Sequence, residues 1–265
     1  MKFGRIIGAS GHPQWVIEDQ GQLKQASGDP FAGDLRAGAN VTGAVRWLTP
    51  VEPAALICIG LNYRQHAIEC SLPLPKEPVV FMKNPSAAAA HLEPIRIPSI
   101  CGDEIDYECE LAVIIGRPCC DVAREQALDY VLGYAPGNDV SARIWQMQRG
   151  GSQWVRGKSF DTFAPFGPLV ATVDEIGAAG DLAIRTELNG EIVQDSTTAD
   201  MIFDVPTIVS FLSQGTTLRP GTVIFTGTPQ GIGWARNPKK LLKAGDQVSV
   251  ELGRVGKLTN PVVAA

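Results

Sequence analysis

Histidine is scarce in this chain, and its few histidines are scattered. The 265 residues include only three, His12, His66 and His91, and no two of them have the spacing of zinc ligands. This inventory excludes a histidine-rich zinc centre. The six cysteines form no C-x-x-C pair, and several fall within apolar stretches. We therefore expect buried free thiols rather than a disulfide framework or a zinc site.

Several features that define other protein classes are also missing. There is no G-x-G-x-x-G or P-loop motif, so we expect no nucleotide cofactor. A net charge of −5 without a cluster of lysine and arginine argues against nucleic acid as a partner. No apolar run reaches the roughly 20 residues of a membrane span, and the N-terminus lacks the apolar core of a secretory signal. These absences predict a mature, cytoplasmic protein that binds neither a membrane nor nucleic acid.

The apolar segments predict an α+β protein that is mostly β. Short alternating runs between residues 3 and 27 predict a β-meander, so we place a small N-terminal β domain at residues 1–50 and a catalytic domain at residues 51–265. The Asn189-Gly190 turn predicts one hairpin, and residues 247–252 and 256–263 predict another. Helices are expected only at residues 122–131, 141–148 and 206–214. Because helices do not alternate regularly with strands, a doubly wound sheet is excluded.

Two acidic residues stand at the start of the most strand-like segment. Residues 111–115 are an apolar run closed by Gly116, so Glu108 and Glu110 should project from one face of a strand. Their repulsion, about 4 kcal/mol at about 4 Å and an effective dielectric of about 20, would be removed by a divalent cation. Asp139 follows the next apolar segment and supplies a third carboxylate. Three carboxylates from strand ends suit magnesium or manganese, although an E-x-E pair on its own usually lines a solvated sheet face.

Seven short motifs, read in order, resemble those of the fumarylacetoacetate hydrolase family. They are Gly60-Leu61-Asn62-Tyr63 with His66-Ala67-Ile68-Glu69, Phe81-Met82-Lys83, Asp106-Tyr107-Glu108-Cys109-Glu110-Leu111, Gly137-Asn138-Asp139-Val140-Ser141-Ala142-Arg143, Gly157-Lys158-Ser159-Phe160-Asp161, Leu188-Asn189-Gly190 and Gly227-Thr228-Pro229-Gln230-Gly231. The resemblance covers residues 56–262 and implies a mixed β-roll-like catalytic domain of that family's type. It also implies a homodimer and one Mg²⁺ or Mn²⁺ ion per chain, held by Glu108, Glu110 and Asp139.

His66 and Glu69 lie three residues apart in a short predicted helix, for which Asn62 is a suitable N-cap. Positions i and i+3 share a helix face, so the carboxylate can orient the imidazole. Together with the resemblance, this favours a general base that deprotonates a water molecule. The alternative is an exposed pair that contributes only about 0.2–0.5 kcal/mol.

Five further residues are candidates for the site. Lys158 is expected to stabilise an oxyanion near the metal. Arg143, on a helix that starts near Asp139, should clamp a substrate carboxylate with Gln146 nearby, although an ion pair with Asp139 is the alternative. Thr228 can hydrogen-bond the same carboxylate from a tight turn, and Lys83 at a strand end can add a charge behind the site.

These parts predict an enzyme, a metal-dependent hydrolase that cleaves a C–C bond in a 2,4-dioxo acid of the acylpyruvate or fumarylpyruvate type. The 2-oxo acid would chelate the ion, and pyruvate would be released, a reaction that relatives use in aromatic catabolism. An oxaloacetate decarboxylase or a 2-hydroxyhepta-2,4-diene-1,7-dioate isomerase is the alternative, because each passes through the same enolate. A non-catalytic, metal-stabilised binding module is a more distant one. The candidates for the acyl pocket are Ile144, Trp145 and Trp154.

Overall fold

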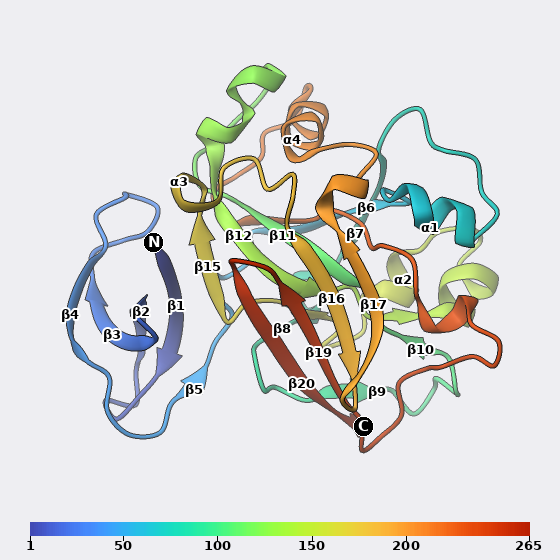
Figure 1. Cartoon of the computed structure of the whole chain (residues 1–265), viewed down its shortest axis with the longest axis horizontal. Coiled ribbons are helices and arrows are strands. Elements are labelled where there is room, and N and C mark those ends of the chain that lie inside the picture. Colours follow the sequence, from blue (N-terminus) through green and yellow to red (C-terminus); the bar gives the residue numbers. More distant parts are fainter.

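The computed structural model describes all 265 residues, and strands dominate it (Figure 1). The strands of the larger sheet are β1 (Lys2–Ile7), β2 (Pro13–Asp19), β3 (Gln22–Ser27), β4 (Arg36–Asn40), β5 (Arg46–Trp47), β6 (Ala55–Gly60), β7 (Val79–Lys83), β11 (Cys109–Ile115), β12 (Val131–Asn138), β15 (Leu169–Thr172) and β18 (Thr222–Phe225). The second sheet contains β9 (Ile95–Ile97), β16 (Ala183–Leu188), β17 (Glu191–Thr197), β19 (Gln247–Leu252) and β20 (Gly256–Ala264). Two short pairs complete the set: β10 (Ile105–Asp106) with β13 (Ser141–Ala142), and β8 (Ala88–Ala89) with β14 (Ala164–Pro165).

Both large sheets are mixed. The order in the eleven-stranded sheet is β4-β3-β2-β1-β15-β12-β11-β18-β6-β7, with β5 paired to β1. The five-stranded sheet runs β17-β16-β19-β20-β9. Parallel pairs, β18 with β6 and β20 with β9, stand among antiparallel ones. The predicted class, α+β and mostly β, is confirmed, as are both predicted hairpins, β16–β17 and β19–β20.

The core lies on both faces of β11, because all seven residues of this strand are buried. Leu111, Val113 and Ile115 belong to a cluster of 26 residues shared with β16, β19 and β20 of the second sheet. Ala112 and Ile114 belong to a cluster of 15 on the opposite face. Successive side chains alternate between faces, so one strand joins both clusters. This double burial gives the residues at the start of β11 a rigid support.

Of the three predicted helices, one is regular. Residues 206–214 correspond to α4 (Val205–Ser213), capped by Asp204, whose carboxylate accepts the Thr207 N–H at 2.9 Å. Residues 122–131 instead contain a 3₁₀ helix, Arg124–Tyr130, which has no side-chain cap and runs directly into β12. The other α-helices are α1 (Arg64–Glu69), α2 (Val155–Lys158) and α3 (Val173–Ile176). None of the helices is both long and apolar enough to cross a membrane.

The helix predicted at residues 141–148 begins two residues late and is mostly a π-helix. Ser141 and Ala142 form β13, and a π-helical turn follows at Trp145–Arg149. Pairing of β13 with β10 delays its start, and the buried Glu104 then caps the turn, because its carboxylate accepts the backbone N–H groups of Ile144 at 2.5 Å and Trp145 at 3.3 Å. A distant acid thus binds the donors that the first turn of a helix leaves free.

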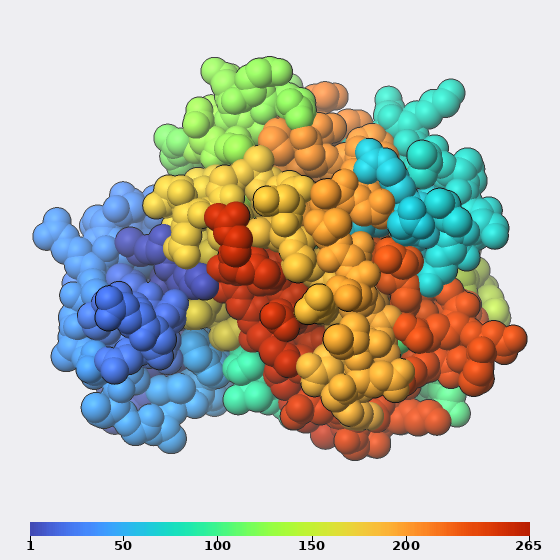
Figure 2. Space-filling model, in the orientation of Figure 1, coloured from blue at the N-terminus to red at the C-terminus, as the bar shows by residue number.

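The N-terminal meander forms at β1–β3 as predicted and occupies one side of the molecule, in blue in Figures 1 and 2. β1 pairs with β15 as well as with β2, so the meander continues the larger sheet. The division into domains at residue 50 stays a prediction.

Candidate metal centre and active site

Two neighbouring strands bring three carboxylates together. β11 and β12 are antiparallel, so the start of β11, at Cys109, lies opposite the end of β12, at Asn138. Glu108 precedes β11, Glu110 is its second residue, and Asp139 follows β12. The Asp139 N–H donates to the Glu108 carbonyl at 2.9 Å. Carboxylate oxygens of Glu108, Glu110 and Asp139, the carboxylate trio below, lie within 4.8 Å of one another, and all three residues are buried.

Two buried lysines contact this trio. Lys158 Nζ lies 2.8 Å from Glu108 Oε2 and 2.8 Å from Asp139 Oδ2. Lys83 Nζ lies 2.5 Å from Asp139 Oδ1 and also donates to three backbone carbonyls. Glu110 has no lysine or arginine partner, and its Oε2 accepts only the Gly227 N–H, at 2.7 Å. Lysine side chains therefore compensate the negative charges of Glu108 and Asp139, whereas the charge of Glu110 has no cationic partner.

The pKa values of the trio follow this asymmetry. Burial, with the charges of Asp139 and Glu108, raises the pKa of Glu110 well above its usual range. Burial alone would also raise the pKa of Glu108, but Lys158 and Arg143 hold it well below its usual range. A hard divalent cation with oxygen ligands would compensate Glu110. The donor set therefore fits magnesium or manganese.

Arg143 lies at the start of a helical turn, as predicted, but this turn follows β13. Its Nε and Nη2 donate to Asp106 Oδ2 at 2.9 and 2.7 Å, not to Asp139. Its Nη1 donates to Gln146 Oε1 at 3.0 Å and lies 2.7 Å from Glu108 Oε1. Asp106 thus occupies the guanidinium edge that was expected to clamp a substrate.

The buried charges nearly cancel. Four carboxylates, Asp106, Glu108, Glu110 and Asp139, meet three cations, Lys83, Arg143 and Lys158. The set carries one excess negative charge when every group is ionised. A divalent cation would reverse that excess to one positive charge, which would attract an anionic substrate.

The predicted His66–Glu69 pair forms on α1. His66 Nδ1 lies 3.0 Å from Glu69 Oε2, and the other carboxylate oxygen of Glu69 accepts the Gly231 N–H at 2.8 Å. Burial alone would lower the pKa of His66, but hydrogen bonds with Cys70 and Glu69 raise it to about 9. The pair therefore holds a proton on an oriented imidazole.

Asn62 is not the N-cap that the sequence suggests. That position belongs to Tyr63, which makes no side-chain cap, while the buried Asn62 amide donates to the carbonyls of Phe203 at 3.0 Å and Thr226 at 2.7 Å. These bonds satisfy buried backbone carbonyls and tie the start of α1 to the end of β18. Gly227 is required beside it: its φ is +98°, and a Cβ there would lie 2.7 Å from that of Asn62.

A cavity of about 180 Å³ connects these groups. Eight of the predicted site residues line it, namely His66, Glu108, Glu110, Asp139, Arg143, Gln146, Lys158 and Thr228. Lys83 and Glu69 are not among its lining residues. Of the candidates for the acyl pocket, Trp154 lines it, whereas Ile144 and Trp145 do not, and Trp145 packs edge-on against Phe160. The remaining wall is largely apolar, with Leu72, Phe81, Met147, Ile232 and Trp234.

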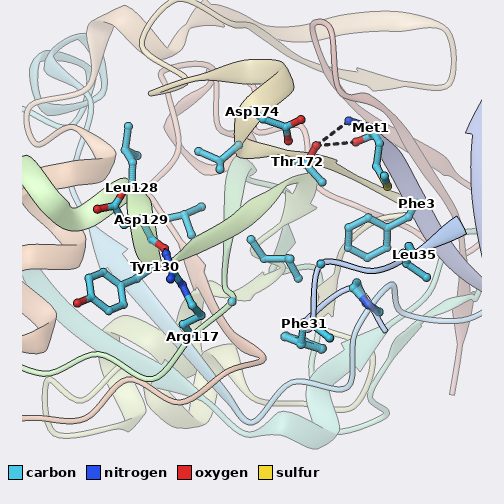
Figure 3. Close-up of a pocket in the computed structure, with 17 residues that line it drawn as sticks. Met1, Phe3, Phe31, Leu35, Arg117, Leu128, Asp129, Tyr130, Thr172 and Asp174 are labelled. Atoms are coloured by element: carbon cyan, nitrogen blue, oxygen red, sulfur yellow. Dashed lines mark hydrogen bonds between the residues drawn. The ribbon is translucent and has the colours of Figure 1, made fainter. Parts of the chain in front are cut away.

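A larger cavity, about 590 Å³, lies between the N-terminal residues and the sheet (Figure 3). Its wall is mostly apolar, and its Arg117 donates to the backbone carbonyl of Asp129. Neither group of side chains that could hold a metal lies in this wall. The smaller cavity is therefore the candidate active site.

Sequence reasoning missed three buried polar residues that hold the site together. Asp106 binds Arg143 and also accepts the Gly233 and Trp234 N–H groups at 2.8 and 2.9 Å. Gln194 donates to Thr228 Oγ1 at 3.0 Å and accepts the Cys109 N–H at 2.9 Å. Glu104 shapes the turn after β13. Only Asp106 had a signal in the sequence, because it stands inside the motif that contains Glu108.

Comparisons with known proteins identify the family. The family described as fumarylacetoacetate (FAA) hydrolase C-terminal matches residues 55–263. A mitochondrial oxaloacetate tautomerase of Xenopus laevis is 45% identical over 217 residues, covering 82% of this chain and 68% of that protein. The crystal structure of a 2-hydroxyhepta-2,4-diene-1,7-dioate isomerase from Mycobacterium marinum has a TM-score of 0.82 at 37% identity, covering 100% of this chain and 98% of that one. A fumarylacetoacetate hydrolase from psychrophilic Exiguobacterium antarcticum has a TM-score of 0.90 at 35% identity, covering 100% of both chains. The resemblance seen in the motifs is thereby confirmed, and this chain belongs to the fumarylacetoacetate hydrolase family.

Proposed function

We propose that this protein is a metal-dependent enzyme that moves a proton on a small 2-oxo dicarboxylic acid, as in the keto–enol tautomerisation of oxaloacetate. The observation that carries the proposal is that His66 and the carboxylate trio line one small cavity. The cavity, about 180 Å³, is below the roughly 300–1,000 Å³ of pockets for drug-sized ligands. Its size favours a four-carbon acid over a long acylpyruvate.

Glu108, Glu110 and Asp139 would hold the metal ion. When bound, a magnesium or manganese ion supplies Lewis-acid polarisation of the 2-oxo group. The Lys158 ammonium, 2.8 Å from two of these carboxylates, adds positive charge where the enolate oxygen develops. Thr228 would face the acid end of the substrate, and Arg143, held by Asp106 and Gln146, would add positive charge there.

The His66–Glu69 pair moves the proton. Because Nδ1 faces Glu69, Nε2 is the atom that delivers a proton to C3 of the enolate or removes one from it. Glu69 orients the ring, and the Gly231 N–H holds Glu69 in turn. The raised pKa of His66, about 9, keeps the imidazole protonated near neutral pH. A protonated His66 can donate a proton in the enol-to-keto direction, whereas the activation of water needs a deprotonated imidazole.

Hydrolysis of a C–C bond in an acylpyruvate or fumarylpyruvate is the second candidate. The likeness to the hydrolase from Exiguobacterium antarcticum favours it, and the same pair, once deprotonated, could activate water. Decarboxylation of oxaloacetate is the third outcome for which an assay should look. The hydrolase activity, the aromatic pathway and the cytoplasmic location remain predictions, and the Xenopus laevis relative is mitochondrial by name.

Glu69→Gln is expected to slow tautomerisation by roughly 100-fold or more, because the imidazole loses its orienting charge. Its pH profile should also shift downward, since removing Glu69 lowers the pKa of His66. The measurement is the decay of enol absorbance with oxaloacetate, alongside pyruvate release from acylpyruvates of graded length. Glu77→Gln, which changes an exposed carboxylate in the segment after α1, is the control. Near-normal enol decay in Glu69→Gln would refute the role of Glu69 in proton transfer. If the wild type releases pyruvate from an acylpyruvate faster than it tautomerises oxaloacetate, the second candidate is selected.

The protein would act as a homodimer, as its family resemblance implies. The support is β7, which ends the larger sheet and exposes Val79, Val80 and Met82. An unpaired edge strand with exposed apolar residues is usually covered by another chain. Val80→Lys is expected to shift the sedimentation coefficient from dimer to monomer, whereas Ile192→Lys, an equally apolar exposed site on β17, should leave it unchanged. A monomeric wild-type protein would contradict the dimer.

A further inference from the structure

The helix that carries the His66–Glu69 pair ends with a third potential metal ligand, Cys70. Its Sγ lies 3.8 Å from His66 Nδ1 and 3.9 Å from His66 Nε2. One ligand atom from each of His66, Glu69 and Cys70 lies within 4.8 Å of the other two. This group shares no residue with the carboxylate trio.

The spacing of the three donors suits a tetrahedral ion. Positions i, i+3 and i+4 lie on one face of α1, where an i, i+4 pair can hold one zinc ion. With zinc distances of about 2.3 Å to sulfur and about 2.0–2.1 Å to nitrogen and oxygen, donors in a tetrahedron are separated by roughly 3.3–3.6 Å. The observed 3.0 Å between His66 and Glu69 and 3.8 Å between His66 and Cys70 lie close to those separations. A small side-chain adjustment would therefore complete the geometry.

The donor chemistry separates this group from the trio. Imidazole, thiolate and carboxylate together favour zinc, whereas three carboxylates favour magnesium or manganese. His66 and Cys70 line the active-site cavity, so a fourth coordination position would be open to water or to a ligand there. Of the six thiols, only Cys70 lines this cavity, and Cys120 is exposed at the surface.

We propose that His66, Glu69 and Cys70 form a zinc site beside the active-site cavity, separate from the carboxylate trio. Binding would release to solvent the thiol proton of Cys70 and the Nδ1 proton of His66, leaving a thiolate and a neutral imidazole as ligands. Zinc on Nδ1 would replace the Glu69 contact that orients the ring and would hold the imidazole as a metal ligand, so occupancy would inhibit the enzyme reversibly. The activity would thus be sensitive to zinc through ligands on α1, the helix that carries the proton-transfer pair.

The direct test is a titration of the magnesium-saturated protein with cadmium, a spectroscopic substitute for zinc. A cadmium–thiolate bond absorbs in the ultraviolet, and cadmium bound only by carboxylates does not. We expect one equivalent of this absorbance in the wild type and in Cys120→Ser, and none in Cys70→Ser or Cys70→Ala. Calorimetry with zinc should show at least about tenfold weaker binding in Cys70→Ser.

Activity gives a second, independent readout. Each variant is compared with its own zinc-free rate, and zinc should inhibit the wild type and Cys120→Ser at concentrations at least about tenfold below those needed for Cys70→Ser. The proposal is overturned if the wild type shows no cadmium–thiolate absorbance, if Cys70→Ser keeps it, or if Cys120→Ser also loses it. Because absorbance and calorimetry need no substrate, this result does not depend on which reaction the enzyme catalyses.

Discussion

Replacing Glu110 with glutamine is expected to abolish magnesium and manganese binding and to lower activity by roughly 10³-fold or more. The reason lies in the unequal compensation of the trio, since Glu110 has only the Gly227 N–H as its partner. A neutral amide removes the charge that most needs a divalent cation. The metal-free variant should be at least as stable as the metal-free wild type, because an uncompensated buried carboxylate is lost.

Calorimetry with manganese and thermal unfolding with and without the ion measure both effects. The matched control is Glu104→Gln, which changes a buried carboxylate outside the trio and keeps an oxygen for the Ile144 N–H. It should retain manganese binding. Wild-type affinity for manganese in Glu110→Gln would contradict the proposed metal centre.

Lys158→Met should cost about 3–5 kcal/mol of the free energy of unfolding and roughly 10²–10³-fold in activity. Its ammonium bridges Glu108 and Asp139, so its loss leaves two buried carboxylates with less compensation. Both partners and the lysine are almost fully inaccessible to solvent. Saturation with magnesium should restore part of the stability, because the ion compensates the same carboxylates.

Urea unfolding with and without magnesium measures this change. Lys257→Met removes a lysine that pairs with Glu187 at the surface, at 2.9 Å, and should cost less than about 1 kcal/mol. If Lys158→Met were no more destabilising than Lys257→Met, the bridging role of Lys158 would be refuted.

The strand at residues 109–115 and the position of Asp139 could be predicted because local patterns determine them. A β-branched run closed by glycine can only be a buried strand here, and alternation places Glu108 and Glu110 on one face. The His66–Glu69 contact could also be predicted, since it depends on helix periodicity alone.

The rest depends on contacts between distant residues. Glu104 caps the π-helical turn after β13, and Asp106 occupies the guanidinium of Arg143 from 37 positions away. Asn62 has the sequence position of an N-cap, but its side-chain amide donates to backbone carbonyls 141 and 164 positions away. Local propensity cannot show such partners, because they become neighbours only after the sheet has formed.

In the folded protein the uncompensated charge falls on one of the two glutamates. The sequence alone predicts that Glu108 and Glu110 together require a divalent cation. In the folded protein Lys158 and Arg143 already stabilise Glu108, and the need for a cation falls on Glu110. The metal would complete a nearly neutral cluster rather than hold together an acidic one.

The most direct test of the metal centre is diffraction from crystals soaked in manganese, with data collected at the manganese absorption edge. We predict one anomalous peak per chain, in contact with oxygens of Glu108, Glu110 and Asp139. A map without a peak among those three side chains, at a manganese concentration that supports full activity, would contradict the account.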